Sequence, residues 1–375
     1  MAAAPEPRPP RARLVTAEPS VNDDLGYPIV VGEGLRAALA AFARKNERPS
    51  VVLCDANPEV QSIAAEVSAA VGSPPVLAFA LGERRKRLAT VERVLDGMLA
   101  AGVERSQLVL GVGGGVASDL FGFASASYMR GVRYAHVATS LVAMVDAAIG
   151  GKTGVDLRGG KNLAGCFRDP VAVFCDVAAL RTLPRRSLRE GLAEIVKAAI
   201  IEGGDFFDSL EELAPHQFSR WPWIGVVDAA IKVKTMTVAD DRLEAGAREV
   251  LNLGHTFAHA IERASKYRTA HGSAVAVGLR AAGLLALQTG RFSESDHLRV
   301  LALLALLGLP LRTAADPDEL LAAMSSDKKR RGGRLRFVLP RAIGDVEYGV
   351  ESARRSVRAV LSRLQEEPER FRARR

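Results

Sequence analysis

The sequence has few cysteines and few aromatic residues, and each shortage argues against a class of protein. Its 375 residues include three cysteines, which lack CxxC spacing and lie in or beside apolar segments: Cys54, Cys166 and Cys175. This pattern argues against a disulfide scaffold and against a thiolate metal site. Aromatic residues amount to 5% and do not interleave with the basic runs, which argues against binding of single-stranded nucleic acid.

Long hydrophobic segments are also missing. The longest apolar run, 300–311, is too short to cross a bilayer. The N-terminal segment MAAAPEPRPPRAR has no apolar stretch after its charges, so it does not read as a secretory signal. We therefore expect a cytoplasmic protein that does not associate with membranes.

Positive charge is in moderate excess, with 51 Lys and Arg against 43 Asp and Glu and a net charge of +8. Much of the excess is local, in DKKRRGGRLR at 327–336 and RFRARR at 370–375. A small polyanionic substrate, together with solvated basic tails, explains this charge. We therefore do not expect a nucleic-acid partner.

The apolar pattern changes character near residue 178. Before it, β-branched runs such as SVVLCDA and QLVLGVGGG alternate with helical stretches, which is typical of βα units and a parallel sheet. After it, long helical runs dominate: 186–202, 222–239, 249–266, 272–289, 294–307 and 317–325. We predict a disordered tail, an α/β domain, a mainly α-helical domain and a basic tail, at 1–13, 14–178, 179–365 and 366–375.

Three of the six histidines, His255, His259 and His271, fall within seventeen residues. His255 and His259 are four apart in a run of helical periodicity and share a face, as do Glu194 and Lys197 at a spacing of three. Two imidazoles and a carboxylate form the ligand set of a catalytic divalent metal with an open coordination position. The spacing favours a metal site and leaves its chemistry open. A polar helix face with hydrogen-bonded core histidines is the alternative.

A glycine-rich turn, GVGGGVASDLFGF at 111–123, follows an apolar strand and opens a helix. Its backbone N–H groups and the helix dipole suit a pyrophosphate. Asp55 and Asn57 end an earlier apolar strand, where a ribose or adenine contact is expected in an open sheet. A dinucleotide fits these features, while a purely structural turn remains open, because the spacing is not GxGxxG.

Polar residues between 128 and 167 lie in apolar, glycine-rich sequence: Arg130, Asp146, Lys152, Lys161 and Asn162. Glycines near Lys152 and Lys161 predict tight turns that present an ammonium to a phosphate. Surface ion pairing is the alternative, and it requires acidic neighbours at helical spacing, of which few are present.

The chain resembles 3-dehydroquinate synthase, within the sugar phosphate cyclase superfamily, from about Gly26 to Val350. The motifs that carry the resemblance are GYPIVVGEGL, GERRKRLATVERVLDGML, GGGVASDLFGFASASYMRGV, VDAAIGGKTGVD, GGKNLAG, RTLPRRSLREGLAEIVK, GAREVLNLGHTFAHAIE, HGSAVAVG and DKKRRGGRLRFVLPRAIGDV. The resemblance implies a Rossmann-like NAD-binding domain, a helical domain carrying zinc or cobalt, and an active site between them.

Carried over by position, the resemblance also implies roles for individual residues. The implied metal ligands are Glu194, His255 and His271. The implied NAD contacts are Asp55, Asn57, Glu83, Lys86, Gly114, Gly115, Val116, Asp119, Thr139, Ser140, Asp146, Lys161 and Thr182. The implied phosphate contacts are Lys152, Asn162, Asn252, His259 and Lys329, the last preferred over Lys328. Arg248 and Lys234 would meet a carboxylate, with Arg130 contributed by the other subunit of a homodimer. The implied catalytic residues are Asp146, Lys152, Lys197, Arg248, Asn252 and His259, with Lys197 binding a substrate hydroxyl or orienting a ligand.

The expected reaction converts 3-deoxy-D-arabino-heptulosonate 7-phosphate into 3-dehydroquinate and phosphate in the shikimate pathway. The alternatives are amino-dehydroquinate, 2-deoxy-scyllo-inosose and 2-epi-5-epi-valiolone synthases, and an iron-type polyol dehydrogenase of similar fold. Arg248 argues against the second and third, whose substrates have no carboxylate. The sequence departs from the family pattern at Ser118, Ala138, Asp156 and Ser273, which leaves the choice of substrate open.

Overall fold

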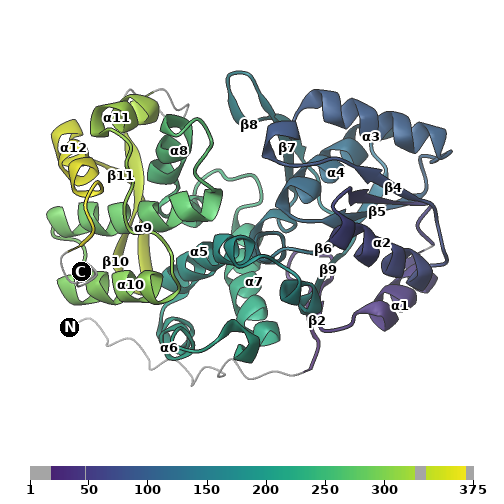
Figure 1. Ribbon diagram of the computed structural model, residues 1–375, viewed down its shortest axis with the longest axis horizontal. Coiled ribbons are helices and arrows are strands. Elements are labelled where there is room, and N and C mark those ends of the chain that lie inside the picture. Colours follow the sequence, from purple (N-terminus) through teal and green to yellow (C-terminus); the bar gives the residue numbers. More distant parts are fainter. Residues whose placement is uncertain (1–17, 47, 326–334, 369–375) are drawn as a thin grey trace.

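The computed structural model describes residues 18–46, 48–325 and 335–368. They form two halves that lie side by side (Figure 1), a sheet half at 18–182 and a helical half at 183–368. The predicted succession of a parallel-sheet domain and a helical domain is thus confirmed. No helix in these ranges is both long and apolar enough to cross a membrane.

The sheet half is built on seven strands in the order β1-β2-β9-β6-β5-β3-β4. Their bounds are β1 Ser20–Asn22, β2 Ile29–Gly32, β3 Val51–Asp55, β4 Val76–Phe79, β5 Leu108–Gly113, β6 Arg133–Ala138 and β9 Val173–Asp176. Only β1 pairs antiparallel. The central strands β5, β6 and β9 are mostly apolar and buried because helices cover both faces of a parallel sheet.

Four helices cover that sheet: α1 Arg36–Asn46, α2 Pro58–Ala70, α3 Leu88–Ala100 and α4 Gly115–Ser127. Successive strand residues point to opposite faces, so Val52 and Cys54 pack with α1 and α2, whereas Val51 and Leu53 pack with α3 and α4. A hairpin of β7 Lys152–Leu157 and β8 Gly160–Phe167 packs against α4. Short helical segments complete this half: η1 Glu83–Arg85, η2 Tyr128–Arg130, η3 Ala143–Ala147 and η4 Val177–Arg181.

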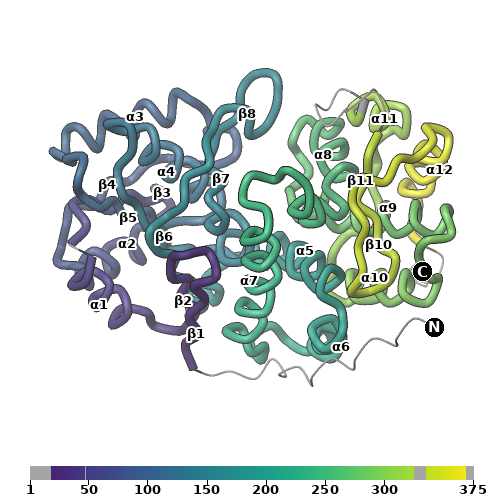
Figure 2. The backbone as a smooth tube through the Cα atoms, turned by 180° about the vertical axis from the view of Figure 1, so that it is seen from behind, coloured from purple at the N-terminus to yellow at the C-terminus, as the bar shows by residue number. Residues whose placement is uncertain are grey.

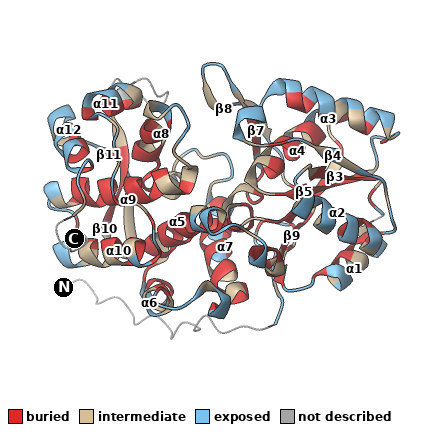
Figure 3. Ribbon diagram, viewed as in Figure 1, coloured by how far each residue is buried: buried red, intermediate tan, exposed pale blue. Residues whose placement is uncertain are grey.

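The helical half surrounds α9, which is buried along nearly its whole length (Figure 3). Its elements are α5 Arg185–Glu202, α6 Gly204–Leu213, η5 Phe218–Arg220, α7 Trp223–Asp240, η6 Ala247–Asn252, α8 His255–Ala264, α9 His271–Gln288, α10 Glu294–Leu306, α11 Pro317–Ser325, β10 Arg336–Ala342, β11 Asp345–Glu351 and α12 Arg354–Arg363. The hairpin β10–β11 packs beside α9, as the reverse view in Figure 2 also shows. One hydrophobic core joins this half to β2 and β9 through Ile29 and Val173, so the halves share an apolar boundary.

The predicted single helix over 249–266 is wrong. The structure ends η6 at Asn252 and begins α8 at His255, with Gly254 between them in the left-handed region at φ 78°. A Cβ on Gly254 would lie 2.9 Å from the main-chain nitrogen of Leu279 in α9. The close approach of α9 therefore excludes any side chain at this position and sets the first residue of α8.

Candidate active site

Glu194, His255 and His271 meet in the helical half, from three different helices. Their ligand atoms all lie within 4.8 Å of one another. Nε2 of His271 is 3.0 Å from Oε1 of Glu194, and Nε2 of His255 is 3.6 Å from the same oxygen. The two histidines are the first residues of α9 and α8, while Glu194 is buried in the middle of α5. Packing of these helices therefore brings the predicted ligand set together.

The other ring nitrogen of each histidine faces an oxygen. Nδ1 of His255 is 3.2 Å from the carbonyl oxygen of Leu253, and Nδ1 of His271 is 3.3 Å from Oε1 of Glu262. An imidazole that donates from Nδ1 keeps the lone pair of Nε2 for a metal. Lys197 Nζ lies 2.6 Å from Oε2 of Glu194, one turn along α5, as an ion pair. The arrangement fits a divalent metal held by two imidazoles and one carboxylate.

The electrostatics of the triad also suit a cation. Burial and the Lys197 ammonium lower the pKa of His255 to about 3. Burial alone would lower the pKa of His271, but its hydrogen bonds to the Glu194 and Glu262 carboxylates outweigh burial and raise that pKa to about 10. A proton on His271 thus balances negative charge of Glu194 and Glu262. A divalent cation bound by the triad would balance the same charge.

A buried ion pair lies next to the triad, between Lys234 of α7 and Asp146 of η3. Lys234 Nζ donates to the carboxylate of Asp146 and, at 2.7 Å, to its carbonyl oxygen. Burial would raise the pKa of Asp146, but the Lys234 and Lys197 ammonium groups outweigh it and hold that pKa at about 2. The pair joins the two halves and connects the triad with the residues predicted to bind substrate.

Glu244 organises the predicted phosphate contacts. It accepts a hydrogen bond of 2.6 Å from Lys152 Nζ and one of 2.9 Å from Asn252 Nδ2. Arg248 is buried nearby and donates to the carbonyl oxygens of Arg242 and Gly150 at 2.7 and 3.1 Å. A guanidinium carries five N–H donors, so these two bonds orient the group without using all of its donors.

The predicted NAD contacts gather at the carboxyl edge of the sheet, where open parallel sheets bind nucleotides. They follow the ends of five parallel strands: Asp55 and Asn57 after β3, Glu83 and Lys86 after β4, Gly114, Gly115, Val116 and Asp119 after β5, Thr139 and Ser140 after β6, and Thr182 after β9. Lys86 is buried and pairs with Asp119, whose pKa is raised by burial to about 6 despite this ammonium. Asn57 caps α2 by accepting from Glu59 N.

The hairpin places Lys161 and Asn162 apart from the other predicted phosphate contacts. Asn162 accepts a hydrogen bond of 2.6 Å from Lys86 Nζ at the nucleotide edge. Lys161 pairs with Glu83 and Glu262 at 2.5 and 3.1 Å. Acidic partners for Lys152 and Lys161 therefore exist, but they come from distant segments of the chain, so they do not appear as neighbours at helical spacing.

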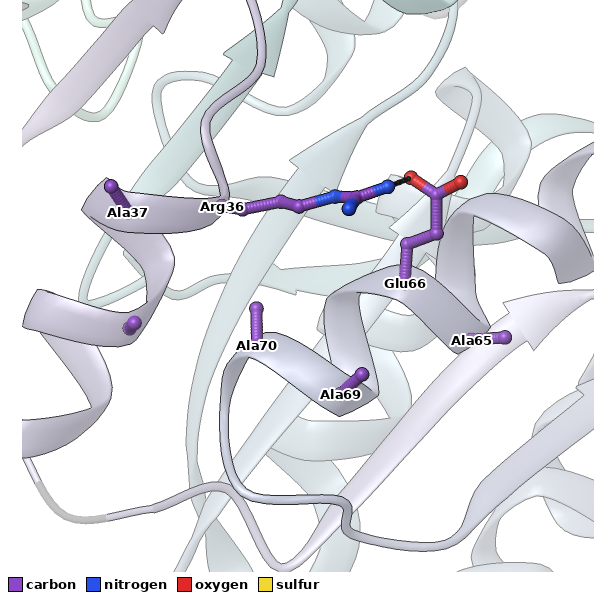
Figure 4. Close-up of a pocket in the computed structure, with 7 residues that line it drawn as sticks. Arg36, Ala37, Ala65, Glu66, Ala69 and Ala70 are labelled. Atoms are coloured by element: carbon purple, nitrogen blue, oxygen red, sulfur yellow. Dashed lines mark ion pairs between the residues drawn. The ribbon is translucent and has the colours of Figure 1, made fainter.

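The remaining predicted residues differ in their surroundings, and His259 lies beside the triad. Arg130 is exposed at the end of η2, with φ 66°, and His259 stacks edge to face on His255 with 5.6 Å between ring centroids. Lys329 is outside the described residues. A shallow hollow between α1 and α2 is lined by alanines and crossed by the Arg36–Glu66 ion pair (Figure 4). None of the predicted site residues lines this hollow.

Three carboxylates near the site were not predicted from the sequence. Glu262 follows His255 and His259 at spacings of seven and three, so the same helical periodicity could have found it. Glu190 precedes Glu194 by one turn of α5 and accepts hydrogen bonds from Gly272 N at 2.6 Å and Ser273 Oγ at 3.3 Å at the start of α9. Glu244 lies in an irregular loop with φ 58°, where no periodic signal exists.

Two solved structures similar to this one are of synthases that hold NAD+ and a divalent metal. That of 2-epi-5-epi-valiolone synthase from Streptomyces hygroscopicus subsp. jinggangensis 5008, with NAD+ and Zn2+ bound, has a TM-score of 0.83 and 32% identity, covering 93% of this chain and 98% of that chain. That of 2-deoxy-scyllo-inosose synthase complexed with carbaglucose-6-phosphate, NAD+ and Co2+ has a TM-score of 0.80 and 26% identity, covering 89% of this chain and 96% of that chain. The fold of the chain is that of the sugar phosphate cyclases.

Within that class, the chain belongs to the 3-dehydroquinate synthase family. The N-terminal model of 3-dehydroquinate synthase matches residues 76–190, and the C-terminal model matches residues 191–330. The 3-dehydroquinate synthase of Gloeobacter violaceus is 39% identical over 347 residues, covering 90% of this chain and 96% of that protein. The resemblance in the sequence motifs is thus confirmed, and the chain is an enzyme of this family.

Proposed function

We propose that this chain is a 3-dehydroquinate synthase, a phosphate-eliminating lyase that converts 3-deoxy-D-arabino-heptulosonate 7-phosphate into 3-dehydroquinate and phosphate. The observation that carries the proposal is the Glu194, His255 and His271 triad, connected through Asp146 and Lys234 to cationic and amide groups suited to phosphate and carboxylate. Membership of the family supports the same substrate.

In the proposed reaction a substrate hydroxyl is oxidised to a ketone, phosphate is eliminated, the ketone is reduced again, and the opened ring closes by an intramolecular aldol step. When bound, NAD supplies a hydride acceptor that later returns the hydride, and a zinc or cobalt ion in the triad supplies a Lewis acid. Oxidation and reduction cancel, so substrate and products balance without net redox.

The residues of the chain bind and orient the substrate. Lys152 and Asn252, already held together by Glu244, would bind the phosphate and stabilise the charge of the leaving group. Arg248 and Lys234 would hold the carboxylate, since a buried guanidinium anchored by two carbonyl oxygens presents its remaining donors in a fixed direction. Lys197 would orient Glu194 or bind a substrate hydroxyl.

The decisive assay supplies the purified protein with NAD, Co2+ and the heptulosonate phosphate, and follows phosphate release together with NADH absorbance. We expect phosphate release that requires NAD and leaves no accumulating NADH. NADH formed in proportion to product would overturn the proposal and favour a polyol dehydrogenase.

A second candidate is a cyclase that acts on a sugar phosphate without a carboxylate. The structural similarity to 2-epi-5-epi-valiolone synthase favours it. Sedoheptulose 7-phosphate and glucose 6-phosphate should be poor substrates if Arg248 binds a carboxylate. Faster turnover of either compound than of the heptulosonate would select this candidate.

A homodimer and a cytoplasmic location remain predictions of the same proposal. Arg130 is exposed on the sheet half beside Met129, and both have left-handed φ values of 66° and 48°, a strained conformation that often marks functional contacts. We propose that Arg130 reaches the carboxylate site of the neighbouring subunit. Mixing inactive Arg130→Ala and Lys152→Ala subunits should then restore activity, whereas no recovery would indicate that Arg130 does not act across subunits.

A further inference from the structure

Glu262 is a buried carboxylate that touches both the triad and the sheet half. It lies on α8, with 2% of its surface exposed. Its Oε1 is 3.3 Å from Nδ1 of His271 and 3.1 Å from Nζ of Lys161. One oxygen therefore contacts a triad histidine of α9 and an ammonium of the hairpin β7–β8.

Lys161 is held by groups from both halves. Besides Glu262, its ammonium pairs with Glu83 of η1 at 2.5 Å and lies 5.0 Å from the ring centroid of Tyr267, in the loop between α8 and α9. The hairpin that carries Lys161 projects from the sheet half on the side that faces α8 (Figure 1). Docking of the hairpin onto the helical half thus brings this ammonium to Glu262.

The geometry gives Glu262 a defined task. A carboxylate facing Nδ1 holds the imidazole ring in one orientation and leaves Nε2 directed at Glu194, 3.0 Å away. The carboxylate is itself buried, and a buried charge needs a partner to hold one position. Lys161 supplies that partner from the opposite half of the molecule.

We propose that Glu262 is a positioning residue of the metal triad, and that Lys161 makes this positioning depend on the docking of the hairpin. The inference rests on the proposed function, because it takes the triad to bind a metal. Groups that orient metal-binding histidines commonly change metal affinity by about ten- to a hundredfold. Metal affinity, measured without turnover, is therefore the quantity that tests the role.

The experiment titrates metal-free protein with Co2+ and with Zn2+ in competition with a chelator, and records the visible spectrum of the Co2+ form. Glu262→Gln keeps the shape but removes the charge, so we expect at least about tenfold weaker binding and an altered spectrum. Lys161→Met should weaken metal binding by a smaller factor than Glu262→Gln does. The double variant should bind like Glu262→Gln alone, because Lys161 acts through Glu262. Glu212→Gln, on the exposed side of α6, is the matched control and should bind as the wild type does.

Each outcome decides the proposal. Wild-type affinity and spectrum for Glu262→Gln would overturn the positioning role and leave the proposed function standing, whereas wild-type protein that binds neither metal would overturn both. Losses that add in the double variant would overturn the hairpin dependence. Should Glu262→Gln fail to fold, Glu262→Asp keeps the charge but shortens the reach. Weaker Co2+ binding with an altered spectrum would support the role, and unchanged binding would overturn it.

Discussion

The outer surface of the sheet half and the boundary between the halves hold similar ion pairs in different surroundings. Arg36 and Glu66 pair at 2.6 Å across α1 and α2, with 67% and 53% of their side chains exposed. Lys234 and Asp146 pair at the boundary with 11% and 31% exposed. Water screens the first pair, whereas protein groups surround the second. Lys197, Lys234 and Arg248, which are assigned to the reaction, lie in the second setting, where loss of one partner leaves the other without compensation.

Lys234→Met is the largest expected change and tests this comparison directly. Breaking a buried pair leaves an uncompensated charge, so the free energy of unfolding should fall by about 3–5 kcal/mol. Arg36→Met, the matched surface change, should cost less than about 1 kcal/mol. Denaturant unfolding measures both. Equal losses for the two variants would contradict the distinction, and adding Asp146→Asn to Lys234→Met should recover part of the loss.

Arg248→Lys should reduce catalysis next most strongly. The substitution keeps the charge of a buried group but removes the planar fork that the carbonyl oxygens of Arg242 and Gly150 orient. We expect kcat/KM for the heptulosonate to fall by roughly 2–4 kcal/mol in transition-state terms, about thirty- to a thousandfold. Turnover of a substrate without a carboxylate should change little. A parallel loss on both substrates would show that the effect is not carboxylate recognition.

Acid should destabilise the interior through His297 of α10. Neither ring nitrogen has a hydrogen-bond partner among the described residues, and burial with nearby Arg280 and Arg363 lowers the pKa to about 4. Because the unfolded chain binds the proton first, the free energy of unfolding should fall as pH drops from 6.5 to 4, by roughly 3 kcal/mol. Across this range the free energy of unfolding should depend less steeply on pH in His297→Gln than in the wild type. The pH dependence should be unchanged in His216→Gln, a substitution at an exposed histidine. Identical slopes for His297→Gln and wild type would refute this assignment.

Asn57→Ala should have the smallest effect. Its side chain caps α2 on the sheet half through Glu59 N, and loss of such a cap costs about 1 kcal/mol. Thermal unfolding measures this cost, and NAD titration separates it from a cofactor contact. Weakened NAD binding with unchanged stability would assign Asn57 to the cofactor instead of the helix.

Periodic segments of the chain were predictable from sequence. The helices expected at 186–202 and 272–289 are observed as α5 and α9, each within one residue at either end. In such helices the pattern of apolar residues depends on local helix propensity and on whether one face or the whole helix is buried. Helix α8 was misjudged because its start is fixed by α9, where Gly254 meets Leu279, a contact that no local pattern encodes.

The site was predictable where its residues repeat along one helix and not where distant segments meet. Glu194 and Lys197 share a face of α5, and their ion pair follows from the spacing. The contacts of Lys152 with Glu244 and of Lys161 with Glu262 span 92 and 101 residues. Such contacts arise from the packing of whole elements, which the spacing of residues in sequence does not determine.

The separation of the triad along the chain has a consequence for folding. Glu194 and His271 are 77 residues apart, and His255 is placed by the close approach of α9 to Gly254. The three side chains therefore come together through the docking of α5, α8 and α9, and contacts so distant in sequence are of the kind that slows folding. Growth of Co2+ absorbance in a refolding chain would mark the docking of these helices. The triad would therefore report when this part of the tertiary structure has formed.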